Sequence, residues 1–516
     1  PNQRSASAPN RTAWRGLRFP SPPSHSRAPA VPQVLHHPQT MEDWRSAFAE
    51  EWDAVVMGTG MKECLLSGLL SVAGKKVLHV DRNNYYGGAS ASLDIQQLFS
   101  KFAGSAEPSE AELGKLRDYA VDMVPKFIMA GGQLVKVLIH TGVANYMEFK
   151  PVDGSYVYRK GSSGGKIFKV PTTPKEAMKS GMLGMVEKGR MAQFTAWVDA
   201  VKLEDRASWV SKGMTGSTKL ALDTMSGAEF FKFWKLDPST VEFLTHACAL
   251  YRDETYLSKP AYEIVERMKL YLDSMLRFPG MTSPYLYTLY GLGELPQAFA
   301  RLAAVHGGTY MLNRDLEGVP VFGPDDLTVE YEGGVACGVK CQEVVARTKV
   351  VIADPSYFPK LCVPVGKVVR AIALLGTPVA GAEDCDSFQV IFPAAQVARK
   401  NDLYLFCCGA GHKVAPQGRY VAFLSTTVET SVEGESAQAT AMRELAGGLQ
   451  MLGNATRIFY DVTDLMKPAK DGAADKVFLS ESFDATTHFE TAITDVLAMY
   501  KRISGADLVL TDGPQQ

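Results

Sequence analysis

The chain has 516 residues, is 46% hydrophobic and carries a formal net charge of −2 at neutral pH. It is long enough for two domains with a large core, and the near-zero charge argues against a nucleic-acid-binding protein. No apolar run approaches the roughly 18 residues that a membrane-spanning helix requires.

The eight cysteines are scattered along the chain. Cys337 and Cys341 form an isolated C-x-x-x-C without a second pair of ligands, so we expect no metal site. Proteins of the reducing cytosol keep such residues as thiols, and we therefore expect free cysteines.

Residues 1–40 differ from the rest of the chain, with five arginines, eight prolines and no lysine or acidic residue. A segment of this composition cannot bury a core, so we expect a disordered N-terminal extension. Segments rich in Arg and Ser and poor in acids are also typical of organelle transit peptides, which is the alternative.

The stretch from Asp53 to Gly88 has the pattern of a strand, a turn, a helix and a second strand. Asp53 to Met57 is a short apolar run, and Gly58-Thr59-Gly60 forms a tight turn. The segment from Glu63 to about Ala73 has helical spacing and is followed by Gly74. Lys76 to Val80 is the second strand and ends at Asp81. This pattern predicts the opening of a dinucleotide-binding fold.

One position of this motif departs from the dinucleotide-binding pattern. In G-x-G-x-x-G the third glycine would stand at position 63, where this chain has Glu63. A carboxylate there would lie close to a bound diphosphate, and like charges about 4 Å apart repel by roughly 4 kcal/mol at an effective dielectric constant of about 20. Glu63 could also simply favour the positive end of the helix dipole. We therefore predict the fold but no bound dinucleotide cofactor.

Four stretches resemble the Rab GDP-dissociation inhibitor family, which is related to the Rab escort proteins. They are GTGMKECLLSGLLSVAGKKVLHVDRNNYYGG, VPKFIMAGGQLVKVLIHTGVANYMEFK (124–150), SPYLYTLYGLGELPQAFARLAAVHGGTYMLN (283–313) and FDATTHFET (483–491). Members of that family also carry Glu in place of the third Gly. Because the resemblance starts just after Met41, we expect Met41 to be the natural start.

The resemblance implies an α/β fold, with an FAD/NAD(P)-binding Rossmann-like multisheet domain and a smaller all-helical domain inserted in it. We expect residues 41–172 and 279–505 to form the main domain, residues 173–278 the helical lipid-binding domain, and residues 506–516 a tail. The family has a platform that binds small GTPases, and Tyr86, in the loop after Asp81, matches a tyrosine of it. A tyrosine packed against its own turn is the alternative.

The middle of the chain shows a hairpin and then helices. Residues 155–170 alternate as two strands around a Gly-Ser-rich turn. Ser226-Gly-Ala-Glu229 is a capping box, and Asp237-Pro238 combines an N-cap with proline at the first helical position. An ordinary helical core explains the apolar faces that follow. The resemblance implies that this bundle opens to hold a geranylgeranyl chain, and that Arg277 starts a mobile loop.

The second informative stretch is Gly291 to Asn313. It predicts a helix from Glu294 to about His306, with an apolar face and with Glu294, Gln297 and Arg301 on one polar face. Thr309 begins a strand. By resemblance, Glu294, Arg301, Thr309 and Met311 belong to the GTPase-binding platform with Tyr86. A solvated helix face is the alternative.

The remainder predicts short strands over 317–355, a second antiparallel sheet over 366–430, a helix over 437–452 and a closing helix over 490–503. His488 has no companion His or Cys, so we expect a structural histidine.

The resemblance implies a protein, not an enzyme, that binds GDP-bound geranylgeranylated Rab GTPases, slows GDP release, extracts them from membranes and recycles them through the cytosol. We expect a cytoplasmic monomer that contacts membranes transiently. An FAD-dependent amine-oxidase-like oxidoreductase and a Rab escort protein are the alternatives. The sequence shows no nucleophile with a base, no phosphate-binding P-loop and no metal cluster.

Overall fold

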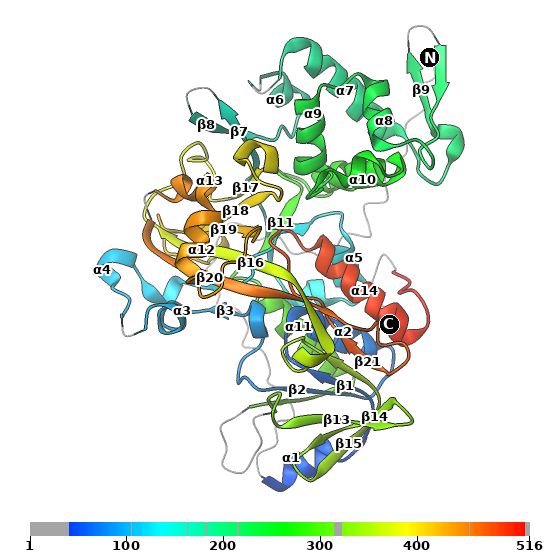
Figure 1. The fold of residues 1–516 in the computed structure, drawn as a ribbon, viewed down its shortest axis with the longest axis vertical. Coiled ribbons are helices and arrows are strands. Elements are labelled where there is room, and N and C mark those ends of the chain that lie inside the picture. Colours follow the sequence, from blue (N-terminus) through cyan, green and yellow to red (C-terminus); the bar gives the residue numbers. More distant parts are fainter. Residues whose placement is uncertain are drawn as a thin grey trace.

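A computed structural model describes residues 41–510, apart from residues 105, 162–163, 180, 182, 214–215, 314–321 and 454. The predicted extension of residues 1–40 and residues 511–516 of the predicted tail lie outside the described residues. Three parts follow one another along the long axis of Figure 1: a sheet near the bottom, a second sheet in the middle and a group of helices at the top.

The first sheet confirms the predicted dinucleotide-binding fold. Five of its strands run parallel in the order β12-β2-β1-β15, with β21 also paired to β15. They are β1 (Glu51–Met57), β2 (Val77–Asp81), β12 (Thr309–Leu312), β15 (Val344–Ala353) and β21 (Val477–Leu479). β14 (Val335–Cys341) and β13 (Leu327–Glu332) extend it in antiparallel fashion. The centre of the sheet is buried on both faces, which matches the apolar run Ala54–Met57 of β1 and the fully buried β2.

Helices cover both faces of this sheet. Alternate residues of β1 face opposite sides: Ala54 and Val56 join one buried cluster, and Val55 and Met57 the other. The first cluster includes α2 (Met61–Val72), α11 (Glu294–Val305) and α14 (Glu490–Ser504); the second includes α1 (Met41–Phe48).

The second sheet has seven strands in the order β20-β16-β19-β18-β17-β7-β8. They are β7 (Gly154–Gly161), β8 (Gly164–Lys169), β16 (Cys362–Leu375), β17 (Ser387–Phe392), β18 (Leu403–Gly409), β19 (Tyr420–Thr427) and β20 (Ala455–Pro468). The predicted hairpin and the predicted antiparallel sheet therefore join into one sheet, in which β7 and β17 pair in parallel. The sequence analysis missed β20, whose residues are mostly half-buried and do not alternate cleanly. α12 (Ala437–Glu444) and α13 (Ala446–Leu449) lie beside this sheet.

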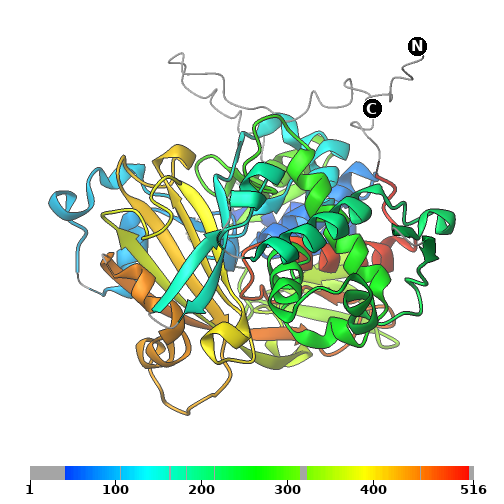
Figure 2. The same cartoon turned by 90° about the horizontal axis from the view of Figure 1, so that it is seen from above.

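The helical region contains α6 (Pro174–Lys179), α7 (Met185–Ala200), α8 (Gly227–Trp234), α9 (Pro238–Glu242), a π-helical turn (Phe243–Cys248) and α10 (Ala261–Leu276). The capping box at Ser226 and the N-cap at Asp237 are both confirmed. The prediction of an all-helical insertion was wrong in one detail, because β9 (Val210–Gly213) and β10 (Gly216–Lys219) form a hairpin there. Seen from above, these helices lie beside the second sheet (Figure 2).

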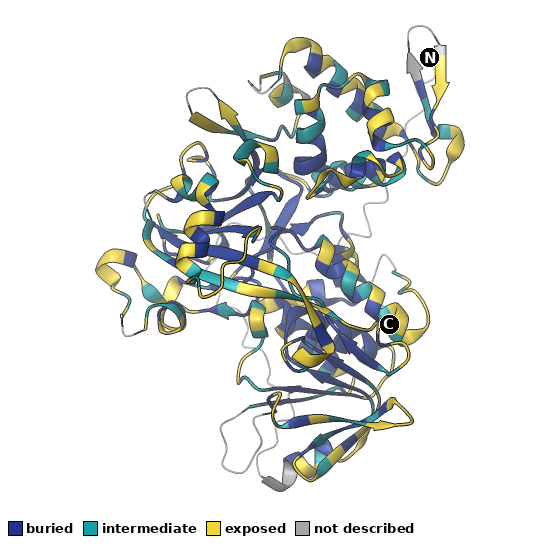
Figure 3. Cartoon of the chain, in the orientation of Figure 1, coloured by how far each residue is buried: buried dark blue, intermediate teal, exposed yellow. Residues whose placement is uncertain are grey.

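Short elements connect the larger parts. A three-stranded sheet combines β5 (Ile128–Met129), β11 (Tyr285–Thr288) and β6 (Phe149–Pro151), and β3 (Ser92–Leu93) pairs with β4 (Val121–Asp122). The remaining helices are α3 (Ile95–Phe102), α4 (Glu110–Leu113) and α5 (Gln133–His140). All eight cysteines are free thiols, as predicted. Figure 3 shows that the strands of both sheets are mainly buried, whereas many helices expose one face.

Candidate functional site

Helix α11 is held tightly on α2. Its predicted apolar face is confirmed: Leu295, Phe299 and Leu302 are buried. A Cβ atom at Gly68 of α2 would lie 3.1 Å from Phe299 Cδ1, which leaves no room for a larger side chain there. The close approach of the two helices thus depends on this glycine, and the tight packing fixes the position of α11.

The opposite face of α11 carries the predicted polar side chains. Glu294 and Gln297 are exposed, and Arg301 is half-buried. The guanidinium carbon of Arg301 lies 4.7 Å from the centroid of the Tyr146 ring, which itself is 42% exposed. A cation over an exposed aromatic ring gains about 0.5–1 kcal/mol. Partial burial raises the pKa of Glu294, although its side chain remains exposed.

Tyr86 lies next to the strand that follows α11. Its ring centroid is 6.2 Å from that of Tyr310, and Tyr310 stacks on His79 at 4.4 Å. The Tyr86 hydroxyl has no hydrogen-bond partner, and burial raises its pKa. Since β12 pairs with β2, the chain brings Tyr86, just after β2, beside residues more than 200 positions later.

The structure separates the remaining predicted residues. Thr309 is half-buried at the start of β12, whereas Met311 is completely buried in the core opposite Val80. Arg277 follows the last residue of α10, in the helical region. We call Tyr86, Tyr146, Glu294, Arg301 and Thr309 the candidate platform. The sequence analysis missed Tyr146, because nothing in its neighbourhood marks it as a partner of Arg301.

The turn between β1 and α2 forms what would be a nucleotide cradle, defined here as residues 58–63 with Asp81. Asp81 Oδ2 accepts hydrogen bonds from the Thr59 main-chain N–H and, at 2.6 Å, from the Thr59 hydroxyl. Its Oδ1 accepts from the main-chain and side-chain N–H groups of Asn83 at 2.7 and 2.9 Å. Both carboxylate oxygens of Asp81 thus already accept hydrogen bonds from groups of the protein itself.

Glu63 fills the other end of this cradle. It is 2% exposed, and its carboxyl group packs against Gly60, where a Cβ atom would collide with Oε2. Burial, together with the charge of Asp354, raises the pKa of Glu63 to about 8. The start of α2 therefore already has a buried acid where an external anion would bind.

Comparisons with known proteins point to one family. Residues 48–515 match the model of the GDP dissociation inhibitor family. Guanosine nucleotide diphosphate dissociation inhibitor 2 of Arabidopsis thaliana is 47% identical over 463 residues, covering 90% of this chain and 97% of that protein. The probable secretory pathway GDP dissociation inhibitor 1 of Schizosaccharomyces pombe is 45% identical, covering 90% and 99%. The chain belongs to the GDP dissociation inhibitor family.

Solved structures agree with this family assignment. The Rab GDI of Plasmodium falciparum superposes with a TM-score of 0.79 at 36% identity, covering 89% of this chain and 100% of that one. An oxidoreductase from Methanosarcina mazei has a TM-score of 0.50 at 14% identity, covering 87% and 100%, and shares the fold alone. The chain therefore has an FAD/NAD(P)-binding Rossmann-like fold.

The fold raises the question of whether the cradle suits a dinucleotide. A diphosphate at the start of α2 needs free main-chain N–H groups and no nearby anion. Here the Glu63 carboxyl group takes up the space in front of the helix, and because its raised pKa keeps it mainly protonated near neutral pH, the obstacle is steric and not the charge repulsion expected from the sequence. Asp81 is saturated by Thr59 and Asn83. A Cβ atom at Gly58 would lie 3.2 Å from the Tyr357 ring, so this side is also filled. The residues present do not fit the cofactor.

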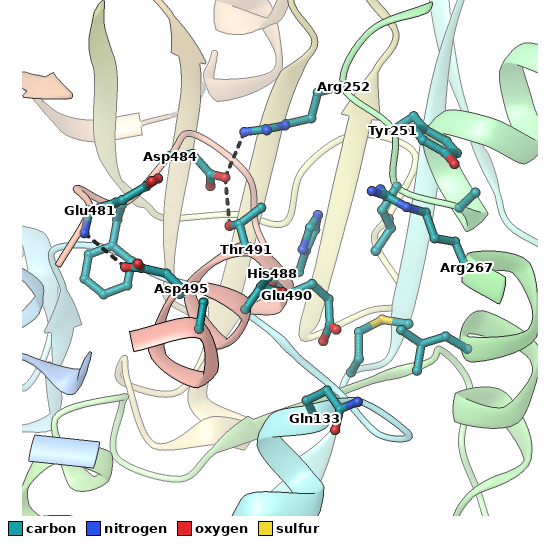
Figure 4. A pocket seen from close by; sticks show the side chains of 18 of the residues that line it. Gln133, Tyr251, Arg252, Arg267, Glu481, Asp484, His488, Glu490, Thr491 and Asp495 are labelled. Atoms are coloured by element: carbon teal, nitrogen blue, oxygen red, sulfur yellow. Dashed lines mark hydrogen bonds and ion pairs between the residues drawn. The ribbon is translucent and has the colours of Figure 1, made fainter. Parts of the chain in front are cut away.

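A cleft of about 1210 Å³ separates the helical region from the main domain. Figure 4 shows Arg252 reaching from the helical side toward Asp484, with His488 and Glu490 beneath. Arg252 pairs with Asp484 at 3.0 Å, and Asp484 also pairs with the fully buried Lys126 at 2.8 Å. Burial lowers the pKa of His488 to about 3, so this histidine stays neutral, consistent with a structural residue. The cleft is rich in charged groups and does not resemble a lipid pocket.

The apolar side chains of the helical region pack on one another instead. Phe194, Phe230 and Trp234 form an aromatic cluster with ring centroids 5.6–5.7 Å apart around Phe194. Every helix in the part of the chain that the structure describes falls short of the length and apolarity needed to cross a membrane. Within those same residues, His, Cys, Asp and Glu side chains do not gather in a group that could hold a metal ion.

Proposed function

We propose that this chain binds GDP-bound Rab GTPases, slows their release of GDP and recycles them between membranes and the cytosol. The observation that carries the proposal is the candidate platform. Glu294 and Arg301 project from a helix that is seated rigidly on α2. Arginine beside an exposed aromatic ring is typical of the energetic centre of a protein interface, and a rigid support keeps such groups in place for binding.

Selectivity for the GDP-bound state would follow from the partner. The switch segments of small GTPases change their order with the γ-phosphate, so a surface that fits the GDP-bound arrangement holds that state. Tyr86, Thr309, Glu294 and Arg301 would contact these segments, and Met311 would support them from the core. The chain would act as a regulator and would need no covalent chemistry.

The helical region is the proposed site for the geranylgeranyl chain of the partner. Trp234 of its aromatic cluster is half-buried, as is Phe233, whose ring centroid lies 5.5 Å from that of Trp234. Burial of a lipid gains about 0.8 kcal/mol per methylene group, which can compete with the marginal membrane binding of a single chain. Arg277 would start the loop that contacts the membrane side. We propose a cytoplasmic monomer that meets membranes only transiently.

The test is the rate of GDP release from a geranylgeranylated, GDP-loaded Rab GTPase. Wild-type protein should slow release, and Arg301→Ala should slow it much less. Arg457→Ala is the matched control, because Arg457 is also half-exposed but lies on β20 of the second sheet. If wild-type protein leaves GDP release unchanged, the proposed function is wrong. If Arg301→Ala equals Arg457→Ala, the function stands without the platform that we assign.

A further inference from the structure

A buried carboxylate lies behind the candidate platform. Asp122, at the end of β4, is 3% exposed. Both of its oxygens lie 2.9 Å from the main-chain nitrogen of Leu292, and the hydroxyls of Ser92 and Tyr287 also donate to it. The Ser92 hydroxyl oxygen in turn accepts the Gly293 N–H at 2.8 Å. We call Asp122, Ser92 and Tyr287 the Asp122 cluster.

This cluster connects the two halves of the candidate platform. Ser92 opens β3 directly after the loop that carries Tyr86, and it pairs with Asp122 across the β3–β4 ladder. Leu292 and Gly293 directly precede Glu294, the first residue of α11. Ser92 and Gly293 are 201 positions apart in the chain. One carboxylate therefore fixes the end of the Tyr86 loop against the start of the helix that bears Arg301.

The surroundings are adapted to this contact. Gly291 has φ +91°, and a Cβ atom there would lie 2.8 Å from Asp122 Oδ1. A Cβ atom at Gly293 would likewise lie 2.8 Å from Ser92 Oγ. Only glycine lets the chain pass so close. The Thr288 hydroxyl also donates to the Gly291 carbonyl at 2.7 Å, which fixes the same turn.

The cluster is expensive to bury. Its three donors to Asp122 are uncharged, and burial raises the pKa of this carboxyl group. An acid without a charged partner costs folding free energy, and hydrogen bonds compensate for it only in part. An apolar residue would avoid the desolvation of a carboxylate, but it would leave the Leu292 N–H and the hydroxyls of Ser92 and Tyr287 without their acceptor. The carboxylate of Asp122 thus provides hydrogen bonds that fix the end of the Tyr86 loop relative to the start of α11.

We propose that Asp122 is a positioning residue that holds the Tyr86 loop and the start of α11 in the arrangement needed for GTPase binding. It acts through Ser92, Leu292 and Gly293 and does not touch the partner. The inference rests on the proposed function, because the platform must bind a GTPase for its alignment to matter.

The decisive variant is Asp122→Asn, which keeps the shape but replaces one acceptor with a donor that faces other donors. Asp402→Asn is the matched control, since Asp402 is also buried but binds His246 Nδ1 at 2.7 Å and the Ala394 N–H at 2.8 Å, away from the platform. Both variants should lower the thermal unfolding temperature. Affinity for a GDP-loaded, geranylgeranylated Rab GTPase is then measured at a temperature where both are folded.

We expect Asp122→Asn to weaken binding about tenfold, equivalent to about 1.4 kcal/mol, with Asp402→Asn within about twofold of wild type. Amide hydrogen exchange should also become faster at residues 88–93 and 289–295 in Asp122→Asn alone. Binding equal to wild type by folded Asp122→Asn would overturn the proposal, as would an equal loss in the control.

The exchange measurement separates this inference from the proposed function. If wild-type protein binds no GDP-loaded GTPase, the proposed function fails. Hydrogen exchange is then the measurement that tests whether the Asp122 cluster holds the two segments. Unchanged exchange at residues 88–93 and 289–295 would then show that Asp122 does not hold these segments, and faster exchange confined to them would show that it does.

Discussion

The cradle lies within the β1–α2–β2 unit and the residues of the candidate platform lie outside it, and the two use their polar groups in opposite ways. In the cradle, Asp81 and Glu63 are buried, and the donors of Asp81 come from the protein itself. On the platform, Glu294 is exposed and Arg301 lies over an exposed ring. The comparison teaches that the fold can be kept while the inner ligand site is filled, which leaves recognition to an outer surface, here the proposed platform.

The two regions are also physically connected. Asp81 binds Asn83, which lies in the loop that leads to Tyr86. Tyr86 then packs near Tyr310, whose hydroxyl bonds the Ser67 hydroxyl of α2 at 3.0 Å. Asp81 of the cradle and Ser67 of α2 thus bind residues next to Tyr86 and help to fix its position.

The largest expected effect on stability comes from removing the buried side chain that packs α11 against α2. Phe299→Ala deletes a completely buried ring that packs on Gly68, and such a change costs about 3–5 kcal/mol of unfolding free energy. Denaturant unfolding measures it. Val305→Ala, on the same helix but 68% exposed, should stay within about 0.5 kcal/mol of wild type. An equal loss of unfolding free energy in both variants would show that Phe299 does not hold α11 against α2.

The second effect concerns the acid of the cradle. Asp81→Ala leaves the N–H groups of Thr59 and Asn83 without their acceptor, and unsatisfied buried donors should lower the unfolding free energy by about 2–3 kcal/mol. Because the Tyr86 loop loses its anchor, GTPase affinity should fall as well. The control is Asp118→Ala, at a side chain that is 42% exposed. A stable Asp81→Ala protein would indicate that the cradle does not support the loop.

The third effect is a pH dependence. The pKa of Glu63 is raised to about 8 in the folded state, so the folded protein holds this proton more tightly than the unfolded chain. Stability should therefore fall as pH rises from about 4.5 to about 8, and then level off. Glu63→Gln should remove this fall, so that its stability relative to wild type is higher at pH 8 than near pH 5 by roughly 3–4 kcal/mol.

Unfolding of wild type, Glu63→Gln and Glu343→Gln at both pH values checks this prediction. Glu343 is 96% exposed, and its replacement should give no pH-dependent difference. If Glu63→Gln differs from wild type by the same amount at both pH values, Glu63 is not the titrating group.

The smallest effect concerns the ring beneath Arg301. Tyr146→Ala removes the partner of the guanidinium group and should weaken GTPase binding by about 0.5–1 kcal/mol, about two- to fivefold, without changing the unfolding free energy noticeably. Tyr331→Ala, at a tyrosine of β13 that is 46% exposed, should bind as wild type does. A loss in the Tyr331 variant of the same size would contradict the assignment of Tyr146.

The sequence was sufficient for the elements whose signals are local. The strand–turn–helix–strand at residues 53–81, the helix over 294–305 and the caps at Ser226 and Asp237 were predicted and confirmed. Each depends on short-range periodicity or on a capping side chain. The β9–β10 hairpin and β20 were missed because their alternation is weak, and β20 also pairs with the distant strand β16.

The candidate platform could be predicted from the sequence only in part. Helical spacing placed Glu294 and Arg301 on one face, but it could not show that Tyr146 lies under Arg301 or that Met311 is buried. Asp122 is a single acid in the apolar stretch 120–124, but spacing and periodicity do not show which donors a buried carboxylate would meet there. Its meaning comes from contacts with Leu292 and Gly293, which only the folded chain brings to it.

The central claim is that recognition resides on the candidate platform and not in the cradle. Affinity for a GDP-loaded, geranylgeranylated Rab GTPase should be compared for Arg301→Glu and Glu63→Gln at pH 7, with both proteins verified as folded. The account predicts that Arg301→Glu loses at least about 2 kcal/mol, roughly thirtyfold, whereas Glu63→Gln binds within about twofold of wild type. Tight binding by Arg301→Glu together with a large loss in Glu63→Gln would contradict it.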